Sequence, residues 1–354
     1  MLSNKIDDWF SAISKENMDE NRTEYSRLLK ELSLTKSDIL HIKFTIFSIK
    51  FFMEQESFDE VEATIKGLHQ SKYVMTYPLL FHFENFQGIF YYKMEDYETS
   101  LEHFEAAKKY SEFIDVSQKE QAKLYYSLGL TTGKLNKNQQ SIAYTSKSLK
   151  ISQSLYHFKD CVKDHILLGI LYKRSRLFKE ALKEYKKARE LSKITSDHHI
   201  LHTIEHNLGT LYSYFQNSPL AIEHFRSSLA YQGTNEGHCT TYLSLSKEFY
   251  KEGKMEEARK AFNQGRSLSI SSENISRIVL KEYEMLEDIY NNDLETLDKK
   301  MIQEILPMFE EENFFHLISE YLTYIGDQYY QSGKFKKSSK YYSLSNKYLN
   351  KLIK

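Results

Sequence analysis

Histidines gather in the segment that begins at residue 197. His198, His202 and His206 recur every four residues, a spacing that would place their imidazole rings on one face of a helix. Two imidazoles at this spacing can share a zinc ion. The HExxH pattern of zinc proteases is absent, however, and no second group of ligands accompanies the histidines. We therefore expect no metal site, and we interpret His206 as part of a polar binding wall.

The two cysteines do not suggest catalysis either. Cys161 and Cys239 lie far apart, outside any CxxC pair and without a nucleophile–base pattern beside them. They are expected to be buried, reduced thiols. The sequence also contains no glycine-rich phosphate loop. We predict no cofactor, and the residues by themselves indicate no catalytic group.

A repeated unit surrounds these side chains. Residues 164–229 contain two copies of one pattern: Leu-Gly, an aromatic residue, Ala, a second aromatic residue and a small residue. The first copy is centred on Gly169 and the second on Gly209, 40 residues further on. This order is typical of the tetratricopeptide repeat (TPR), a pair of antiparallel helices. We expect Ala181 and Ala221 to face the two glycines across each helix pair.

The pattern can be followed along most of the chain, at offsets of roughly 37–41 residues. Further copies are centred on Gly88, Gly129 and Gly326, with degenerate copies before and between them. We predict an all-α fold, a TPR superhelical solenoid of about eight helix pairs in which each pair packs on the next. Residues 1–75 are predicted to form an N-terminal helical bundle that includes a degenerate first repeat. Residues 76–354 would form the TPR receptor domain.

The composition agrees with a helical repeat protein. The 354 residues include 27 Tyr and 22 Phe but only 3 Pro and 12 Gly, which suits aromatic packing between helices. A net charge of −1 gives no general attraction to nucleic acid or to a membrane. The N-terminus lacks the apolar core of a signal peptide, and no apolar run reaches the roughly 20 residues that span a bilayer. We expect a cytoplasmic protein without nucleic-acid or membrane partners.

A solenoid of this type binds its ligands along the first helix of each pair. An extended peptide exposes backbone N–H and C=O groups, and an Asn side chain can bind both at once. Asn207 stands just before Leu-Gly in the second copy, and Ser244 holds the equivalent place in the next repeat. We predict that Asn207, Ser244 and His206 bind a peptide, although polar residues at these positions could also be solvated.

Two basic residues, Lys173 and Arg174, end the first helix of the preceding repeat. They could bind a peptide carboxylate or an acidic side chain, or they could form a solvated helix end. Asn85 and Tyr125, in earlier repeats, are further candidates for the peptide groove.

With this order of elements, the chain resembles the Rap family of bacterial quorum-sensing regulators, the response regulator aspartate phosphatases. The resemblance covers almost the whole chain. It is carried by the segments NKIDDWFSAI, SDILHIKFTIFSIKFF, HNLGTLYSYFQNSPLAIEHFRSSLA and EEENFFHLISEYLTYIGDQYY. The first two are similar to the N-terminal bundle of the family, and the other two resemble Rap segments in register.

The resemblance implies a regulator with two functional parts. In the family, the N-terminal bundle docks on a response regulator and either dephosphorylates its phospho-aspartate or blocks its DNA-binding domain. The TPR domain binds a short signalling peptide, which shifts the protein between two global states. The implied partners are a short signalling peptide and a response regulator, and Asn207 matches the peptide-clamping Asn of the family.

The expected catalytic position departs from the family. Rap phosphatases carry a Gln in the N-terminal bundle that is thought to position the attacking water, and by alignment it falls at or beside Ser37. Neither Ser37 nor Asp38 is a good substitute for Gln. The resemblance therefore implies binding to a response regulator and leaves phosphatase activity open.

Two alternatives remain at this point. The chain could be a TPR scaffold that joins proteins without a small-peptide signal, or the receptor part of a peptide-sensing transcription factor. The DNA-binding relatives of this receptor carry an N-terminal helix-turn-helix, which this sequence lacks. We therefore expect no direct binding to DNA.

Overall fold

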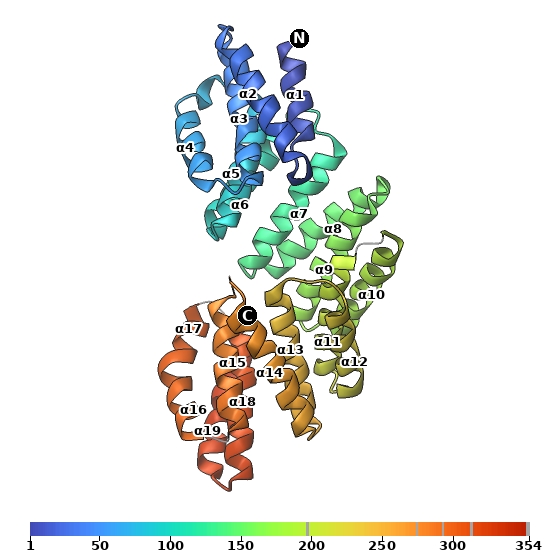
Figure 1. Ribbon diagram of the computed structural model, residues 1–354, viewed down its shortest axis with the longest axis vertical. Coiled ribbons are helices and arrows are strands. Elements are labelled where there is room, and N and C mark those ends of the chain that lie inside the picture. The colour runs from blue at the N-terminus through green and yellow to red at the C-terminus, as the bar shows by residue number, and fades with distance from the viewer. Residues whose placement is uncertain (196–197, 274, 292–293, 312–313, 352–354) are drawn as a thin grey trace. The chain divides into compact units, whose positions relative to one another are not determined.

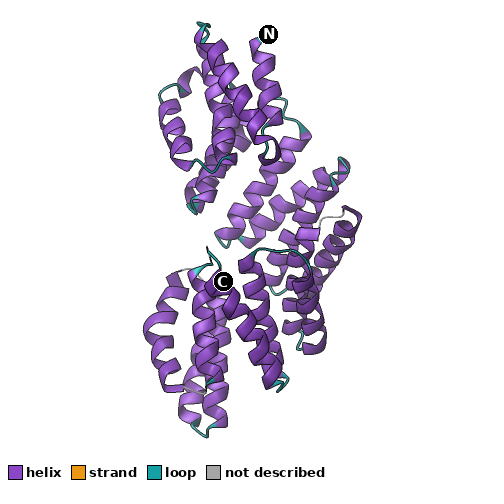
Figure 2. Ribbon diagram, viewed as in Figure 1, coloured by secondary structure: helices purple, strands orange, loops and turns teal. Residues whose placement is uncertain are grey.

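The computed structural model describes residues 1–195, 198–273, 275–291, 294–311 and 314–351. All regular structure in these residues is helical, as Figure 2 shows, and the predicted all-α class is confirmed. Short turns join consecutive helices into pairs, as the TPR pattern predicts (Figure 1). No helix in the described part of the chain is long and apolar enough to cross a membrane.

Contacts divide the chain into two compact units, residues 1–168 and residues 169–354. The boundary that we predicted after residue 75 falls inside the first unit. Helices on both sides of that boundary share one hydrophobic core, because stacked helix pairs bury their faces on each other without interruption. The division at residue 75 therefore stays a prediction about function.

The first unit contains three helix pairs behind two leading helices. Its core is rich in aromatic side chains, and the ring of Trp9 packs on Tyr25, Phe44 and Phe51 with centroid distances of 5.8, 5.2 and 5.6 Å. The elements, in order, are α1 (Leu2–Ala12), η1 (Lys15–Asn17), α2 (Met18–Ser33), α3 (Asp38–Glu54), α4 (Phe58–His69), η2 (Lys72–Val74), α5 (Tyr77–Lys93), α6 (Tyr97–Ser111), α7 (Gln118–Lys134) and α8 (Asn138–Ser154).

The second unit begins within α9 (Phe158–Arg174) and contains the candidate binding residues that the sequence favoured most. Its pairs are α9 with α10, α11 with α12, α13 with α14, a less regular pair after α14, and α18 with α19. The elements are α10 (Phe178–Thr195), α11 (His198–Tyr214), α12 (Ser218–Ala230), α13 (Asn235–Lys251), α14 (Met255–Ser271), α15 (Arg277–Tyr290), α16 (Leu294–Lys300), the π-helical η3 (Met301–Ile305), α17 (Leu306–Glu311), α18 (Phe315–Gln331) and α19 (Phe335–Lys351).

The repeat glycines let an aromatic ring touch the backbone of the first helix. A Cβ atom on Gly209 would lie 2.6 Å from the ring of Phe225, and one on Gly169 would overlap the ring of Tyr185. The aromatic ring, one helical turn beyond the alanine on the second helix, therefore fills the space that glycine leaves. At the position equivalent to the alanine, the Ser100 hydroxyl donates to the backbone oxygen of Gly88 at 2.8 Å, so this position faces the repeat glycine as expected.

Candidate functional site

The first helices of two adjacent pairs, α9 and α11, bring Lys173 and Asn207 together. Nζ of Lys173 lies 3.5 Å from Oδ1 of Asn207, and the hydroxyl of Tyr185 on α10 lies 3.5 Å from the same oxygen. The Asn207 Nδ2 group donates to the backbone oxygen of Thr203 at 2.9 Å. Because both contacts to Oδ1 are long for hydrogen bonds, this oxygen can still accept a hydrogen bond from a ligand N–H.

His206 neighbours Asn207 on α11 and presents an acceptor nitrogen. Its Nδ1 lies 2.9 Å from the hydroxyl of Thr241, and that hydroxyl donates its own proton to the backbone oxygen of Gly237 at 2.9 Å. With the Thr241 proton on Gly237, Nδ1 donates to the threonine oxygen and Nε2 is left as an acceptor. Burial, together with the charge of Lys173, lowers the pKa of His206 to about 3. The imidazole is neutral at physiological pH.

Ser244 and Arg174 are the other two candidate residues of the second unit. Ser244 lies half-buried on α13, and its hydroxyl donates to the backbone oxygen of Thr240 at 3.1 Å. Arg174 is exposed at the end of α9, directly after Lys173. The second unit therefore brings together Lys173, His206 and Asn207, with Ser244 on the next first helix.

Asn85 and Tyr125 belong to the first unit, so the group around Asn207 forms without them. Asn85 is half-buried on α5. Tyr125 on α7 stacks on Tyr144 with ring centroids 6.1 Å apart, and Nζ of Lys147 lies 5.3 Å from the Tyr125 ring. These contacts explain Tyr125 as a packing residue, while its role in binding stays a prediction.

A charged cluster in the second unit was missed by the sequence reasoning. Lys247 of α13 forms ion pairs with Glu282 of α15 at 3.0 Å and with Glu320 of α18 at 3.3 Å. The Tyr321 hydroxyl also donates to Glu282, at 2.9 Å. Burial alone would lower the pKa of Lys247, but the two carboxylates outweigh it and raise this pKa well above its usual range. The only sequence signal is that Lys247 follows Ser244 by three residues, on the same side of a first helix.

His316 connects this cluster to the end of α9. Its side chain is exposed to solvent, yet the surrounding protein desolvates it and lowers its pKa to about 4. The carboxylate of Glu320 opposes this shift, and the charges of Lys173 and Arg174 add to it. His316 is thus close enough to the end of α9 for both of its charges to act on the imidazole.

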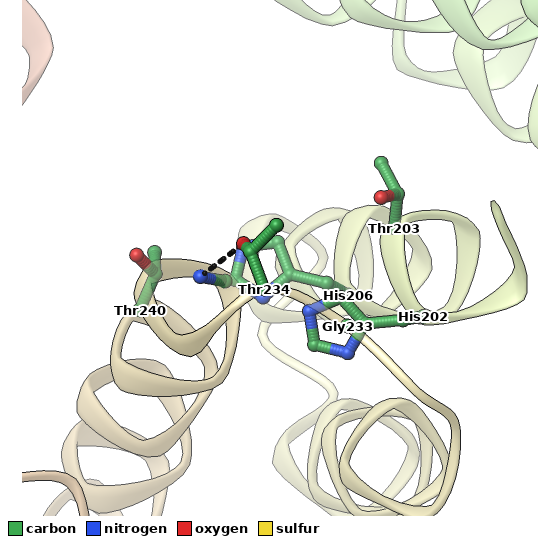
Figure 3. A pocket seen from close by; sticks show the side chains of 7 residues that line it. His202, Thr203, His206, Gly233, Thr234 and Thr240 are labelled. Carbon is green, nitrogen blue, oxygen red and sulfur yellow. Dashed lines mark hydrogen bonds between the residues drawn. The ribbon is translucent and has the colours of Figure 1, made fainter. Parts of the chain in front are cut away.

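A hollow of about 380 Å³ opens beside His206, between α11 and the start of α13 (Figure 3). Its polar lining comes from imidazole rings and threonine hydroxyls. A Cβ atom on either Gly233 or Gly237 would lie 2.7 Å from the His202 ring, so both positions require glycine for this close approach. The lining consists of His202, Thr203, His206, Gly233, Thr234, Gly237 and Thr240.

The histidine series does not form a metal site in the described residues, where no three His, Cys, Asp or Glu side chains gather closely enough to hold an ion. The side chain of His198 lies outside the described part. His202 instead places Nδ1 3.0 Å from the backbone oxygen of Ser228. The prediction of buried thiols is confirmed: Cys161 and Cys239 are unpaired and buried, and burial raises the pKa of each to about 11.

Ser37, the position expected for the catalytic Gln, is the N-cap residue of α3. Its backbone oxygen accepts a hydrogen bond from Nδ1 of His41 at 2.9 Å. Asp38 is the first residue of α3 and is exposed. Both residues therefore have a structural explanation at the start of the helix.

The stacked helix pairs define a TPR-type repeat protein. A family profile described as tetratricopeptide repeat matches residues 164–233, which are the two clearest copies of the pattern. The predicted fold is confirmed.

Comparison with known proteins identifies the relatives of the chain. It is 28% identical to the transcriptional activator NprA of Geobacillus stearothermophilus, over 99% of this chain and 88% of that protein. It is 20% identical to response regulator aspartate phosphatase I of Bacillus subtilis (strain 168), over 98% of this chain and 90% of that protein. The homologues of this chain are thus proteins of the Rap and NprR family, as the sequence resemblance predicted.

Solved structures agree with this relationship. A Rap protein complexed with competence and sporulation factor matches with a TM-score of 0.77 and 15% identity, over 99% of this chain and 98% of that one. NprR in complex with its cognate peptide NprX matches with a TM-score of 0.70 and 18% identity, over 99% of both chains. At these identities the likeness establishes the fold.

Proposed function

We propose that this protein is a cytoplasmic, peptide-responsive regulator. It binds a short signalling peptide in the groove of the second unit and a response regulator through its N-terminal helices. Two neighbours of the same fold are described as complexes with a signalling factor or a cognate peptide. A full-length relative is named a response regulator aspartate phosphatase. The observation in this chain that carries the proposal is the group formed by Lys173, His206 and Asn207.

This group suits an extended peptide because it offers acceptors and donors along one line of first helices. Oδ1 of Asn207 and Nε2 of His206 can accept peptide N–H groups, and the ammonium group of Lys173 can donate to an oxygen. Ser244 adds a hydroxyl on the next helix. The hollow beside His206 gives one peptide side chain a place to enter.

The N-terminal helices offer a separate surface for the response regulator. Leu29, Leu34 and Ile39 are exposed there, with exposed fractions of 51, 89 and 41%. A hollow of about 390 Å³ opens between α2, α3 and α4, with Leu29, His41 and Phe52 in its lining. Exposed apolar side chains of this kind favour contact with another protein. The proposal assigns binding and not catalysis to this surface, because Ser37 stands where Gln is expected.

Peptide binding can be tested with synthetic peptides from short reading frames next to the gene, titrated into the full-length protein by calorimetry. We expect one peptide to bind, and Asn207→Ala to weaken binding at least about tenfold, since it removes a hydrogen bond at the ligand. Asn263→Ala, at an exposed position of α14, is the matched control and should bind as the wild type does. Equal affinity of Asn207→Ala and wild type would refute the assigned site.

The same titration separates the proposal from a plain TPR scaffold. A peptide-responsive regulator changes its population of global states when the peptide binds, so the radius of gyration in small-angle scattering should change with peptide concentration. A scaffold would bind a partner protein without any such response to short peptides.

A further inference from the structure

Two lysines of the second unit lie on the first helices of their pairs, α9 and α13, and their surroundings differ in charge. Lys247 has carboxylates at 3.0 and 3.3 Å, from Glu282 and Glu320. The nearest polar contact of Lys173 is the neutral amide of Asn207, at 3.5 Å. Among the residues that the structure describes, no acidic side chain comes within ion-pair distance of Lys173.

The neighbours of Lys173 do not compensate its charge. Asn207 and Tyr185 are neutral, and His206 is neutral because its pKa is lowered to about 3. Arg174 adds a second positive charge beside it. Desolvation and this repulsion lower the pKa of Lys173 to about 8. The charged form of Lys173 is therefore less stable here than in water, and a bound anion would stabilise it.

We propose that Lys173 binds a carboxylate of the ligand, so that the groove of the second unit selects short peptides that carry an accessible acidic group. The inference rests on the proposed function and specifies which peptides that function uses. A carboxylate oxygen would accept a charge-assisted hydrogen bond from Nζ. Asn207 and His206 stay free to hold the adjoining backbone, since neither is charged and neither competes for the anion.

The carboxylate can come from two sources, the C-terminus of the peptide or an Asp or Glu side chain. Both present the same group to Lys173. Sets of random heptapeptides distinguish these two sources. Each set is made with a free C-terminal acid or with a C-terminal amide. In addition, one version of each set includes Asp and Glu, and the other version has Asn and Gln in their place.

The experiment measures retention of these peptide sets on the immobilised full-length protein, read out by mass spectrometry. We expect retained peptides to carry a carboxylate of one source. Lys173→Met should lower their retention by roughly tenfold to a hundredfold, because it removes a charge-assisted bond. Lys173→Arg keeps the charge and should restore binding. Lys179→Met, at an exposed site on α10, should leave retention unchanged, and circular dichroism checks that each variant is folded.

The pH dependence gives a readout that a merely structural lysine would not move. In the protein without ligand, Lys173 loses its proton near pH 8. Carboxylate binding to wild type should therefore weaken as pH rises from about 8 to 10. Lys173→Arg keeps its proton over this range and should bind at constant affinity.

The possible outcomes separate the two proposals. Retention of peptides that lack any carboxylate, or equal retention by wild type and Lys173→Met, would overturn the role of Lys173 while peptide binding stands. If no peptide of either form is retained, the proposed function and this inference both fail.

Discussion

At the scale of single residues, one acid of the described chain, Asp164 in α9, is buried without a basic partner within ion-pair distance. Its side chain is 1% exposed and faces the hydroxyls of Ser148 and Ser152 on α8. Burial raises the pKa of this carboxyl group to about 7, although the two serine hydroxyls oppose the shift. Asp164 is thus about half protonated near neutral pH.

This pKa links folding to pH in a defined direction. The folded state holds the Asp164 proton up to about pH 7, whereas the unfolded chain loses it near pH 3.8. The stabilising contribution is therefore fully present below about pH 4 and is lost as pH rises to 7. We expect Asp164→Asn to unfold at higher urea concentration than wild type at pH 8, with a gain of about 2–4 kcal/mol.

The control for this prediction is Gln153→Ala on the neighbouring helix α8, at an exposed position that carries no charge. It should leave the pH dependence of the unfolding free energy unchanged, because it removes no titratable group. Identical pH profiles for wild type and Asp164→Asn would show that Asp164 is not the titrating group.

A second prediction concerns the repeat glycines. A Cβ atom on Gly88 would lie 2.6 Å from the buried ring of Phe104, whereas one on Gly67 would meet nothing within 4 Å. Gly88→Ala should destabilise the first unit by about 1–3 kcal/mol because the ring must move. Gly67→Ala, inside α4, should stabilise the same unit by about 0.5–1 kcal/mol through helix propensity. Urea unfolding measures both, and a gain for Gly88→Ala would contradict the packing described here.

Sequence reasoning at this scale worked for the two cysteines, which are buried as expected. Asn207 was singled out because it precedes a recognisable Leu-Gly, and its role in peptide binding stays a prediction. Lys247 and Glu320 could not be found in this way, because 73 residues separate them and charged residues are common on helix surfaces. Only the folded chain shows that α13 and α18 bring these two charges together.

At the scale of elements, the turns inside the helix pairs share one backbone geometry. A residue with positive φ stands in the turn after α3, α5, α7, α9, α11, α13 and α18. Only two of these residues are glycines, so the left-handed turn was visible in the sequence at few positions. The residues are Glu56, Glu95, Asn136, Arg176, Gln216, Gly253 and Gly333.

This geometry predicts opposite effects of two substitutions in the second unit. Gln216 has φ of 56° and Gly253 has φ of 70°. The left-handed region costs a residue with a Cβ atom about 1–2 kcal/mol, so Gln216→Gly should stabilise the unit by about 1 kcal/mol. Gly253→Ala should destabilise it by a similar amount. Thermal unfolding gives both values, and shifts of the same sign would argue against a common turn.

The least regular helix pair shows why elements were harder to predict after residue 271. Between α15 and α18 the second helix is divided into α16, the π-helical η3 and α17. The sequence there retained a helical period without the Gly and Ala of the repeat, so its position in the stack was predictable and its interruption was not. The π-helix has an extra residue in its turn, and no particular residue type in the sequence indicates it.

At the scale of the whole molecule, the proposed regulator has one ligand site in each unit. Lys173, His206 and Asn207 lie in the second unit, and the apolar surface around Leu29 and Leu34 lies in the first. If a peptide switches response-regulator binding, the two ligands must have a coupling free energy, and that coupling must be reciprocal.

We therefore expect the peptide to lower the affinity for the response regulator by a factor of roughly 5–150, the usual range of such coupling. The response regulator must lower the affinity for the peptide by the same factor. Calorimetric titration of each ligand, with and without a saturating amount of the other, measures both factors. Lys173→Met should bind the response regulator normally and lose the effect of added peptide, because it weakens only the peptide complex. If the two affinity factors are unequal, binding is accompanied by a change in oligomeric state or involves a third site. If both affinity factors equal one, the two units bind their ligands independently.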